Sequence, residues 1–229
     1  MRRLLALVVL LAAASTLPAF EAGGGVAVFL PESLYAHGDG SVSVQTALGT
    51  GMRVSDFATI PIRVAYNQVY GLMPSGTTYE SATRPWFYAD SILADIQLKI
   101  RVPLGTFYID AFGGGAANWL AGLKPLTKNI ETSIAAVESG VDQMSFAASP
   151  VYSTGLGFGW LAGGGFGIRI DTISVDLSAT YLTVDHPLSL SGAYYAVPGG
   201  SATVDYTAPD DLGLRMRGLI IGIRGAIAL

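Results

Sequence analysis

Residues 86–101, WFYADSILADIQLKIR, alternate apolar and polar side chains at almost every second position. Successive side chains of a β-strand point to opposite faces of a sheet, so this period predicts one strand with an apolar and a polar face. The predicted apolar face carries Trp86, Tyr88, Ile92, Ala94, Ile96, Leu98 and Ile100. The polar face carries Ser91, Asp95, Gln97, Lys99 and Arg101.

Seven further stretches show the same period, near residues 23–30, 41–54, 60–67, 106–118, 153–170, 173–181 and 219–229. The connections between them alternate long and short along the chain. A transmembrane barrel has this rhythm, because its antiparallel strands meet short turns on one side and long loops on the other. The pattern predicts an all-β fold, an eight-stranded antiparallel transmembrane β-barrel with one short helix in an external loop.

The N-terminus has the layout of an export signal. Arg2 and Arg3 precede an apolar run over residues 4–14, and Pro18 follows with small residues. The run is far shorter than the roughly 20 residues of a membrane-spanning helix. We expect residues 1–22 to be a cleaved secretory signal, with Ala19 as the alternative cleavage position. Residues 23–229 would then form a single barrel domain in a bacterial outer membrane, with both termini in the periplasm.

The composition excludes several classes of site and partner. The absence of cysteine rules out disulfides, a lipid-modified cysteine and a thiolate metal site. A net charge of −4 argues against a nucleic-acid partner, which calls for a basic surface. Residues 143–168 carry no charge, but seven glycines between Gly155 and Gly167 favour a strand over a spanning helix.

The alternation by itself fits both a soluble sandwich with apolar side chains inside and a barrel with apolar side chains in lipid. The export signal and the loop asymmetry favour the barrel. Trp86, Tyr88, Phe107 and Trp119 lie near predicted strand ends, where membrane barrels carry girdles of aromatic side chains.

Two arginines do not fit this scheme directly. Arg215 and Arg217 have the same parity as the outward Leu219. Either a β-bulge near Gly218 shifts the phase, or both side chains lie above the hydrocarbon and contact lipid headgroups.

The inward faces collect charged residues toward the periplasmic mouth. The predicted set comprises Arg53, Arg63, Arg101, Arg169 and Arg224, with Asp95, Asp110 and Asp176 about one layer further in. An eight-stranded lumen is wide enough only for side chains or one small ligand. The set therefore predicts either an Arg–Asp network that plugs the barrel or an arginine-lined constriction for anions and polar solutes. The glycines of residues 155–167 could leave a narrow channel, or could permit close packing and curvature.

The longest loop covers about residues 120–152. Within it Ile130, Ile134, Val137, Val141 and Met144 recur at helical spacing, which predicts a short amphipathic helix across the external mouth. This helix could also act as a lid.

The chain offers little for catalysis. His37 and His186 are predicted in external loops, and Asp185 would point away from its neighbour His186. No serine lies in a nucleophile elbow and no two histidines have metal-ligand spacing. We expect no enzymatic activity, no metal and no cofactor.

The eight strands, four external loops and terminal strand resemble the small eight-stranded outer-membrane barrels, the OmpW-like and more distantly the OmpA-transmembrane and OmpX-like families. The resemblance is architectural and brings no binding residue. It implies a structural role or passage of small hydrophobic compounds. Such barrels usually end in an aromatic residue, whereas residues 226–229 read AIAL.

These observations give two functional expectations. The first is limited passage or binding of small, including hydrophobic, molecules through the narrow arginine-lined lumen. The alternative is a non-transporting structural barrel or surface adhesin with a plugged lumen. The expected partners are outer-membrane lipid, the barrel-assembly machinery and a small-molecule ligand, and the expected state is a monomer.

Overall fold

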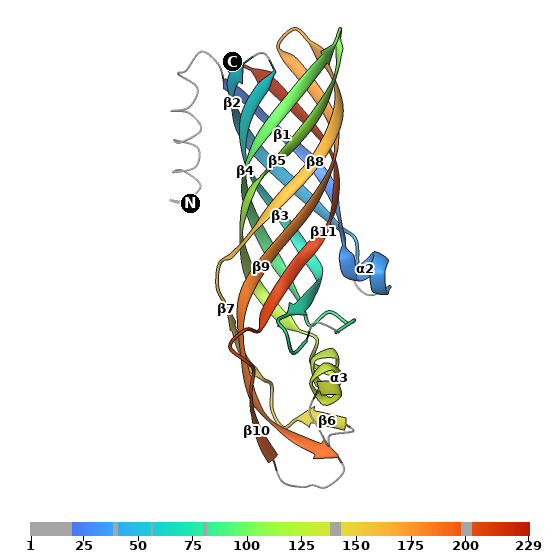
Figure 1. The fold of residues 1–229 in the computed structure, drawn as a ribbon, viewed down its shortest axis with the longest axis vertical. Coiled ribbons are helices and arrows are strands. Elements are labelled where there is room, and N and C mark those ends of the chain that lie inside the picture. Colours follow the sequence, from blue (N-terminus) through green and yellow to red (C-terminus); the bar gives the residue numbers. More distant parts are fainter. Residues whose placement is uncertain (1–19, 39–40, 56, 80–81, 138–142, 198–202) are drawn as a thin grey trace.

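The computed structural model describes residues 20–38, 41–55, 57–79, 82–137, 143–197 and 203–229. Eight strands of this part form a closed antiparallel ring (Figure 1). They are β1 (Phe20–Pro31), β2 (Ser43–Ser55), β3 (Ala58–Ser75), β4 (Phe87–Leu104), β5 (Phe107–Pro125), β8 (Gly157–Ile170), β9 (Ile173–Val197) and β11 (Gly213–Ala228). The pairing of β11 with β1 closes the ring, so the predicted eight-stranded barrel is confirmed.

Short turns join β2 to β3, β4 to β5 and β8 to β9 at one end of the barrel, where the chain also ends (Figure 1). The backbone N–H of Ala228 donates to the carbonyl of Thr172 at 2.8 Å and ties the last strand to the third of these turns. The long connections leave from the opposite end, as the alternating loop lengths predicted. The end with the long connections is called the external end below.

Large apolar side chains cover the outside of the barrel. On β4 the outward side chains of Ile92, Ile96, Leu98 and Ile100 are 38–54% exposed, while Asp95 on the inward face is 4% exposed. The same arrangement repeats around the ring, for example at Val44, Leu48, Ile109, Phe166, Leu177 and Ile223. The barrel thus has an apolar outer surface, where a soluble protein would be polar, and charged side chains in part of its interior.

Strand β9 continues beyond the barrel at the external end (Figure 1). There it pairs with β6 (Gln143–Phe146), β7 (Val151–Thr154) and β10 (Thr203–Thr207). We call these three strands, residues 187–197 of β9 and helix α3 (Thr127–Val137) the cap. A second short helix, α2 (Glu32–His37), follows β1.

Helix α3 lies within the loop where the sequence predicted a helix. Ile130 and Ile134 are fully buried, as expected for its apolar face. Met144 belongs to strand β6 instead of the helix, so that part of the prediction is wrong, and Val141 lies outside the described residues. Helical spacing alone could not show that the helix ends at Val137.

Trp86 does not join the outer girdle of aromatic side chains. It is 0% exposed and its indole Nε1 donates to the Ser133 hydroxyl of α3 at 3.0 Å. The residue lies one position before β4, where the alternation of the strand no longer decides which way a side chain points. Phe107 and Trp119 do lie outside, at about half exposure.

Arg215 and Arg217 point outward without a bulge. The register of β11 with β9 is unbroken from Gly213 to Ile227, so the proposed phase shift near Gly218 is wrong. A second difference concerns β8, which begins at Gly157; the residues before it form the separate strand β7.

The predicted signal, residues 1–22, lies almost entirely outside the described residues, and its cleavage stays a prediction. Strand β1 begins at Phe20, three residues before the predicted start, and Phe20 pairs with Met52 of β2. None of the helices in the described segments is long and apolar enough to cross a membrane.

Candidate functional site

The inward charges lie in the half of the lumen toward the short turns. Arg63 and Asp95 are cross-strand neighbours on β3 and β4. The Arg63 Nε donates to Asp95 Oδ1 at 3.1 Å and Nη2 donates to Oδ2 at 3.1 Å, a two-pronged contact. The Gln97 side chain adds a third donor to Asp95 at 2.6 Å. This carboxylate is fully engaged by its own neighbours.

A second cluster joins two cations and two carboxylates. The Asp110 carboxylate forms ion pairs with Lys99 Nζ at 2.6 Å and with Arg101 Nε at 2.9 Å. The Asp176 carboxylate, on the other side of β8, forms ion pairs with the same two side chains, at 3.4 Å from Lys99 and 3.8 Å from Arg101. All four side chains are nearly excluded from solvent. A buried charge without a partner is strongly unfavourable, and here each charge has an opposite one.

Tyr108 completes this second cluster. Its hydroxyl donates to the Asp176 carboxylate, and the Arg101 guanidinium lies over its ring at 3.7 Å from the centroid. Gly167 of β8 lies between Tyr108 and Asp176 in the sheet. A Cβ on Gly167 would meet the Tyr108 ring and would stand 2.6 Å from the Asp176 carboxylate. The missing side chain therefore lets the two residues meet.

Of the remaining predicted residues, Arg224 is the cross-strand neighbour of Asp176. Arg53 pairs with Glu21 at 3.5 Å and its side chain is one-third exposed. Arg169 and Arg224 also face inward, but neither forms an ion pair with any residue of the described segments. The sequence-based set thus missed Lys99, Tyr108 and Glu21. The alternation of the sequence already placed Lys99 and Tyr108 on inward faces. Glu21 was missed because it was assigned to the export signal.

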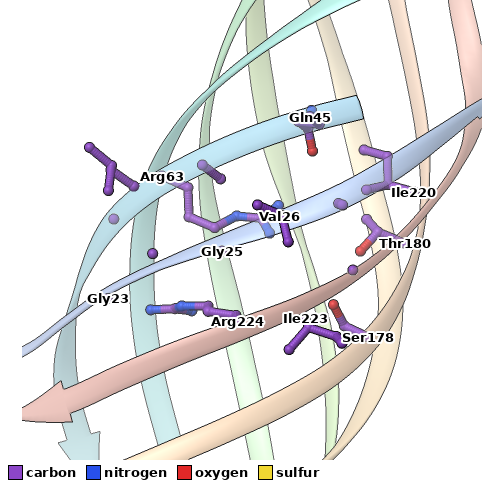
Figure 2. Close-up of a pocket in the computed structure, with 16 residues that line it drawn as sticks. Gly23, Gly25, Val26, Gln45, Arg63, Ser178, Thr180, Ile220, Ile223 and Arg224 are labelled. Atoms are coloured by element: carbon purple, nitrogen blue, oxygen red, sulfur yellow. The ribbon is translucent and has the colours of Figure 1, made fainter. Parts of the chain in front are cut away.

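Arg224 borders a small cavity inside the barrel (Figure 2). The cavity has a volume of about 30 Å³ and is lined by Arg63, Arg224, Thr180 and the glycines of residues 23–25. A water molecule needs roughly 10–15 Å³ of such space. The cavity can hold about two waters and is too small for an organic solute.

A largely apolar layer fills the lumen on the external side of the charges, with the buried polar side chains of Asn67, Ser91 and Asn118 among it. Its inward side chains form one contiguous cluster that includes Phe29, Val69, Leu93, Phe112, Leu120, Leu161, Leu182, Val184 and Met216. Each of these is at most 9% exposed. The layer separates the polar cluster from the cap, a feature that the search for charged residues did not reveal.

Large side chains from neighbouring strands pack against the glycines of β8. A Cβ on Gly163 would stand 2.9 Å from the Phe112 ring, and one on Gly157 would stand 2.6 Å from the His186 Nε2. Of the two interpretations offered by the sequence, these contacts of Gly157 and Gly163 support close packing.

The two histidines lie in different surroundings. His186 belongs to strand β9 and is buried, so its predicted position in an external loop is wrong; its Nδ1 lies 3.3 Å from the carbonyl of Gly155. Asp185 points to the opposite, exposed face, as alternation requires. His37 ends helix α2. The absence of catalysis, metal and cofactor stays a prediction.

Fold and lumen together define a class: a closed eight-stranded barrel, apolar outside, with paired charges and a packed apolar layer inside. No protein-family model matches the chain, and no curated protein matches it either. The outer membrane protein OprG from Pseudomonas aeruginosa is similar in structure at a TM-score of 0.49 and 13% identity, over 90% of this chain and 95% of that one.

Two further solved structures show a weaker similarity. Neisserial surface protein A gives a TM-score of 0.38 at 11% identity, over 92% of this chain and 96% of that one. Ail, the attachment invasion locus protein of Yersinia pestis, gives 0.32 at 9% identity, over 91% and 99%. The predicted architecture is confirmed by the ring of eight paired strands in this chain itself.

Proposed function

We propose that this protein is a closed outer-membrane barrel that carries its cap into the external medium and does not transport solutes. The observation that supports this proposal is that side chains fill the lumen at two levels. Paired charges fill it toward the short turns, and the apolar layer fills it on the external side of these charges. This supports the alternative of the two functional expectations in which the lumen is plugged. The cap would then be the working part, as a contact surface for the cell's surroundings.

Membrane residence is supported by the outward apolar side chains. Burying apolar surface in lipid contributes about 25 cal/mol per Å² and would oppose solubility in water. The short turns and both termini of the barrel domain would face the periplasm, since outer-membrane barrels place short turns there. The long connections and the cap would then be outside.

Limited passage of small molecules is the second candidate. The cavity beside Arg63 and Arg224 favours it, because Arg224 faces this space without an ion-pair partner in the described segments. The cavity volume argues against it, and the apolar side chains of the layer above it are at most 9% exposed.

Liposome swelling with small neutral sugars and single-channel conductance in chloride separate the two candidates. We expect no permeability above protein-free vesicles. We also expect none after Arg53, Arg101 and Arg169 are all replaced by alanine, because the apolar layer remains. Conductance by the natural barrel, or its appearance in the triple variant, would favour passage.

The exposure of the cap is tested by cysteine labelling, since the chain has no cysteine of its own. Val151→Cys, at a site 72% exposed in the cap, should react with an impermeant maleimide on intact cells. Thr106→Cys, in the β4–β5 turn, is the matched control and should react only after the outer membrane is permeabilised. The reverse pattern would contradict the proposed orientation.

A further inference from the structure

Four charged side chains gather on the outer surface of the barrel at its external border. The Arg215 Nε donates to Asp185 Oδ1 at 2.8 Å, and Arg217 Nη1 lies 3.3 Å from Glu32 Oε2 of α2. All four are partly exposed. We call them the border cluster.

The border cluster lies at the height of lipid headgroups. On β11 the outward apolar side chains run from Leu219 to Leu229, a span of ten residues. At about 3.4 Å per residue and a tilt near 40°, such a span covers about 25 Å along the barrel axis, the usual height of the apolar band. Arg217 is the next outward residue beyond this band.

Aromatic side chains surround the two arginines. Trp160 on β8 and Tyr181 on β9, the strand next to β11, pack together at 5.8 Å between ring centroids. Tyr35 of α2 is exposed, and its pKa is raised first by partial burial and then by the negative charge of Glu32. Arg217 acts on the same hydroxyl in the opposite direction. Aromatic girdles mark the boundary between hydrocarbon and headgroups.

The arginines keep hydrogen-bonding capacity that the protein does not use. A guanidinium has five N–H donors. Among the described residues, the Nε of Arg217 is buried without an acceptor, and Arg215 donates from its Nε to Asp185. Unsatisfied donors on a charged group are unfavourable, so an added acceptor would stabilise this arrangement.

We infer that the border cluster binds the phosphate of a lipid headgroup in the outer leaflet. The inference rests on the proposed membrane residence. Guanidinium groups bind phosphate oxygens in a two-pronged geometry. Glu32 and Asp185 hold the two guanidiniums in place and keep the cluster close to neutral. A free anion therefore gains little, whereas a headgroup held at this height by its acyl chains is present at high effective concentration.

The test uses the purified full barrel in neutral detergent, titrated with a lipid that has a phosphate-monoester headgroup, and bound lipid is counted by native mass spectrometry. Two further arms use a zwitterionic choline lipid with the same chains and inorganic phosphate. The variant is Arg215→Gln with Arg217→Gln. The matched control replaces two exposed cations outside the cluster, Arg84→Gln with Lys128→Gln.

We expect the phosphate-monoester lipid to bind the double variant about 30-fold more weakly, since a basic residue near a membrane surface contributes about 1 kcal/mol. The control should bind as the natural protein does. Arg215→Lys with Arg217→Lys, which keeps the charge but loses the two-pronged geometry, should give an intermediate affinity.

Equal binding by natural protein and double variant would overturn the inference, and so would an equal loss in the control. Inorganic phosphate binding as tightly as the lipid would overturn the assignment to a headgroup. Insertion of each protein into neutral vesicles is measured separately. Failure of the natural barrel to insert would contradict the proposed function, whereas insertion without headgroup binding would contradict only this inference.

Discussion

Tyr108 and Asp176 form a hydrogen bond across Gly167, on two strands that are not neighbours in the barrel. The strand between them contributes no side chain at that point. The contact therefore links three strands and orients the carboxylate toward Lys99 and Arg101. The stability of the polar cluster should depend on the size of residue 167.

Gly167→Ala should lower the free energy of unfolding by about 1–3 kcal/mol, the usual effect of overpacking a filled interior. The measurement is urea unfolding of the barrel in lipid vesicles, followed by gel mobility. Gly115→Ala is the matched control, because a Cβ there has no neighbour within 4 Å. If both variants unfold at the same urea concentration, Gly167 has no special packing role.

Asp110→Asn should destabilise the barrel more strongly. It leaves Lys99 and Arg101 with Asp176 as their only carboxylate among the described residues. Breaking a buried ion pair by removing one partner costs about 3–5 kcal/mol. The same unfolding assay checks this value. Asp205→Asn, on the exposed face of β10, should stay within about 0.5 kcal/mol of the natural protein; a small effect at Asp110 would mean that water reaches the cluster.

Trp86→Phe should loosen the attachment of α3 and leave the barrel intact. The substitution removes the hydrogen bond to Ser133 and leaves its hydroxyl with one partner fewer. A loss of about 1–2 kcal/mol would speed local opening roughly five- to thirty-fold. Trypsin cleavage after Lys128, an exposed residue of α3, reports that opening. Trp119→Phe, on the outside of β5, should leave the cleavage rate unchanged, and a parallel rise there would point to general unfolding.

The hydrogen bonds between Thr77 and Asp211 should depend on pH. The amide and the hydroxyl of Thr77 donate to the Asp211 carboxylate at 2.8 and 2.7 Å and hold its pKa below the ordinary value of 3.8. A lowered pKa in the folded state means that the stabilisation is complete above 3.8 and is lost as the pH falls through the lowered pKa. Hydrogen exchange at the Thr77 amide, compared at pH 6 and pH 2.5 after correction for the intrinsic rate, measures this. Asp211→Asn should remove the pH dependence.

The apolar band was predictable because alternation is a local property. On β4, each residue from Ile92 to Arg101 faces the side that its parity assigned. The same rule predicted that Arg215 and Arg217 face outward. Only the unbroken register of β11 showed that no bulge turns them inward. Trp86 escaped the rule because it stands outside a strand, where packing against α3 decides its direction.

Which inward charges pair could not be predicted. Arg101 and Asp110 are cross-strand neighbours, but Lys99 on β4 reaches Asp176 on β9, three strands further along the ring. Distances across a lumen depend on the stagger of the strands and on every side chain between them. These are properties of the closed ring, and no single stretch of sequence contains them.

The order of residues along this chain determined which side chains face lipid and which face the lumen, since a strand alternates wherever it is placed. It also determined the number of strands and the end at which the chain turns back sharply. Only the closed barrel decided which inward charges pair and which apolar side chains pack together in the lumen. It also decided that β9 extends outward to carry the cap. Both depend on contacts between residues far apart in sequence, whose free energy exists only once the ring has formed.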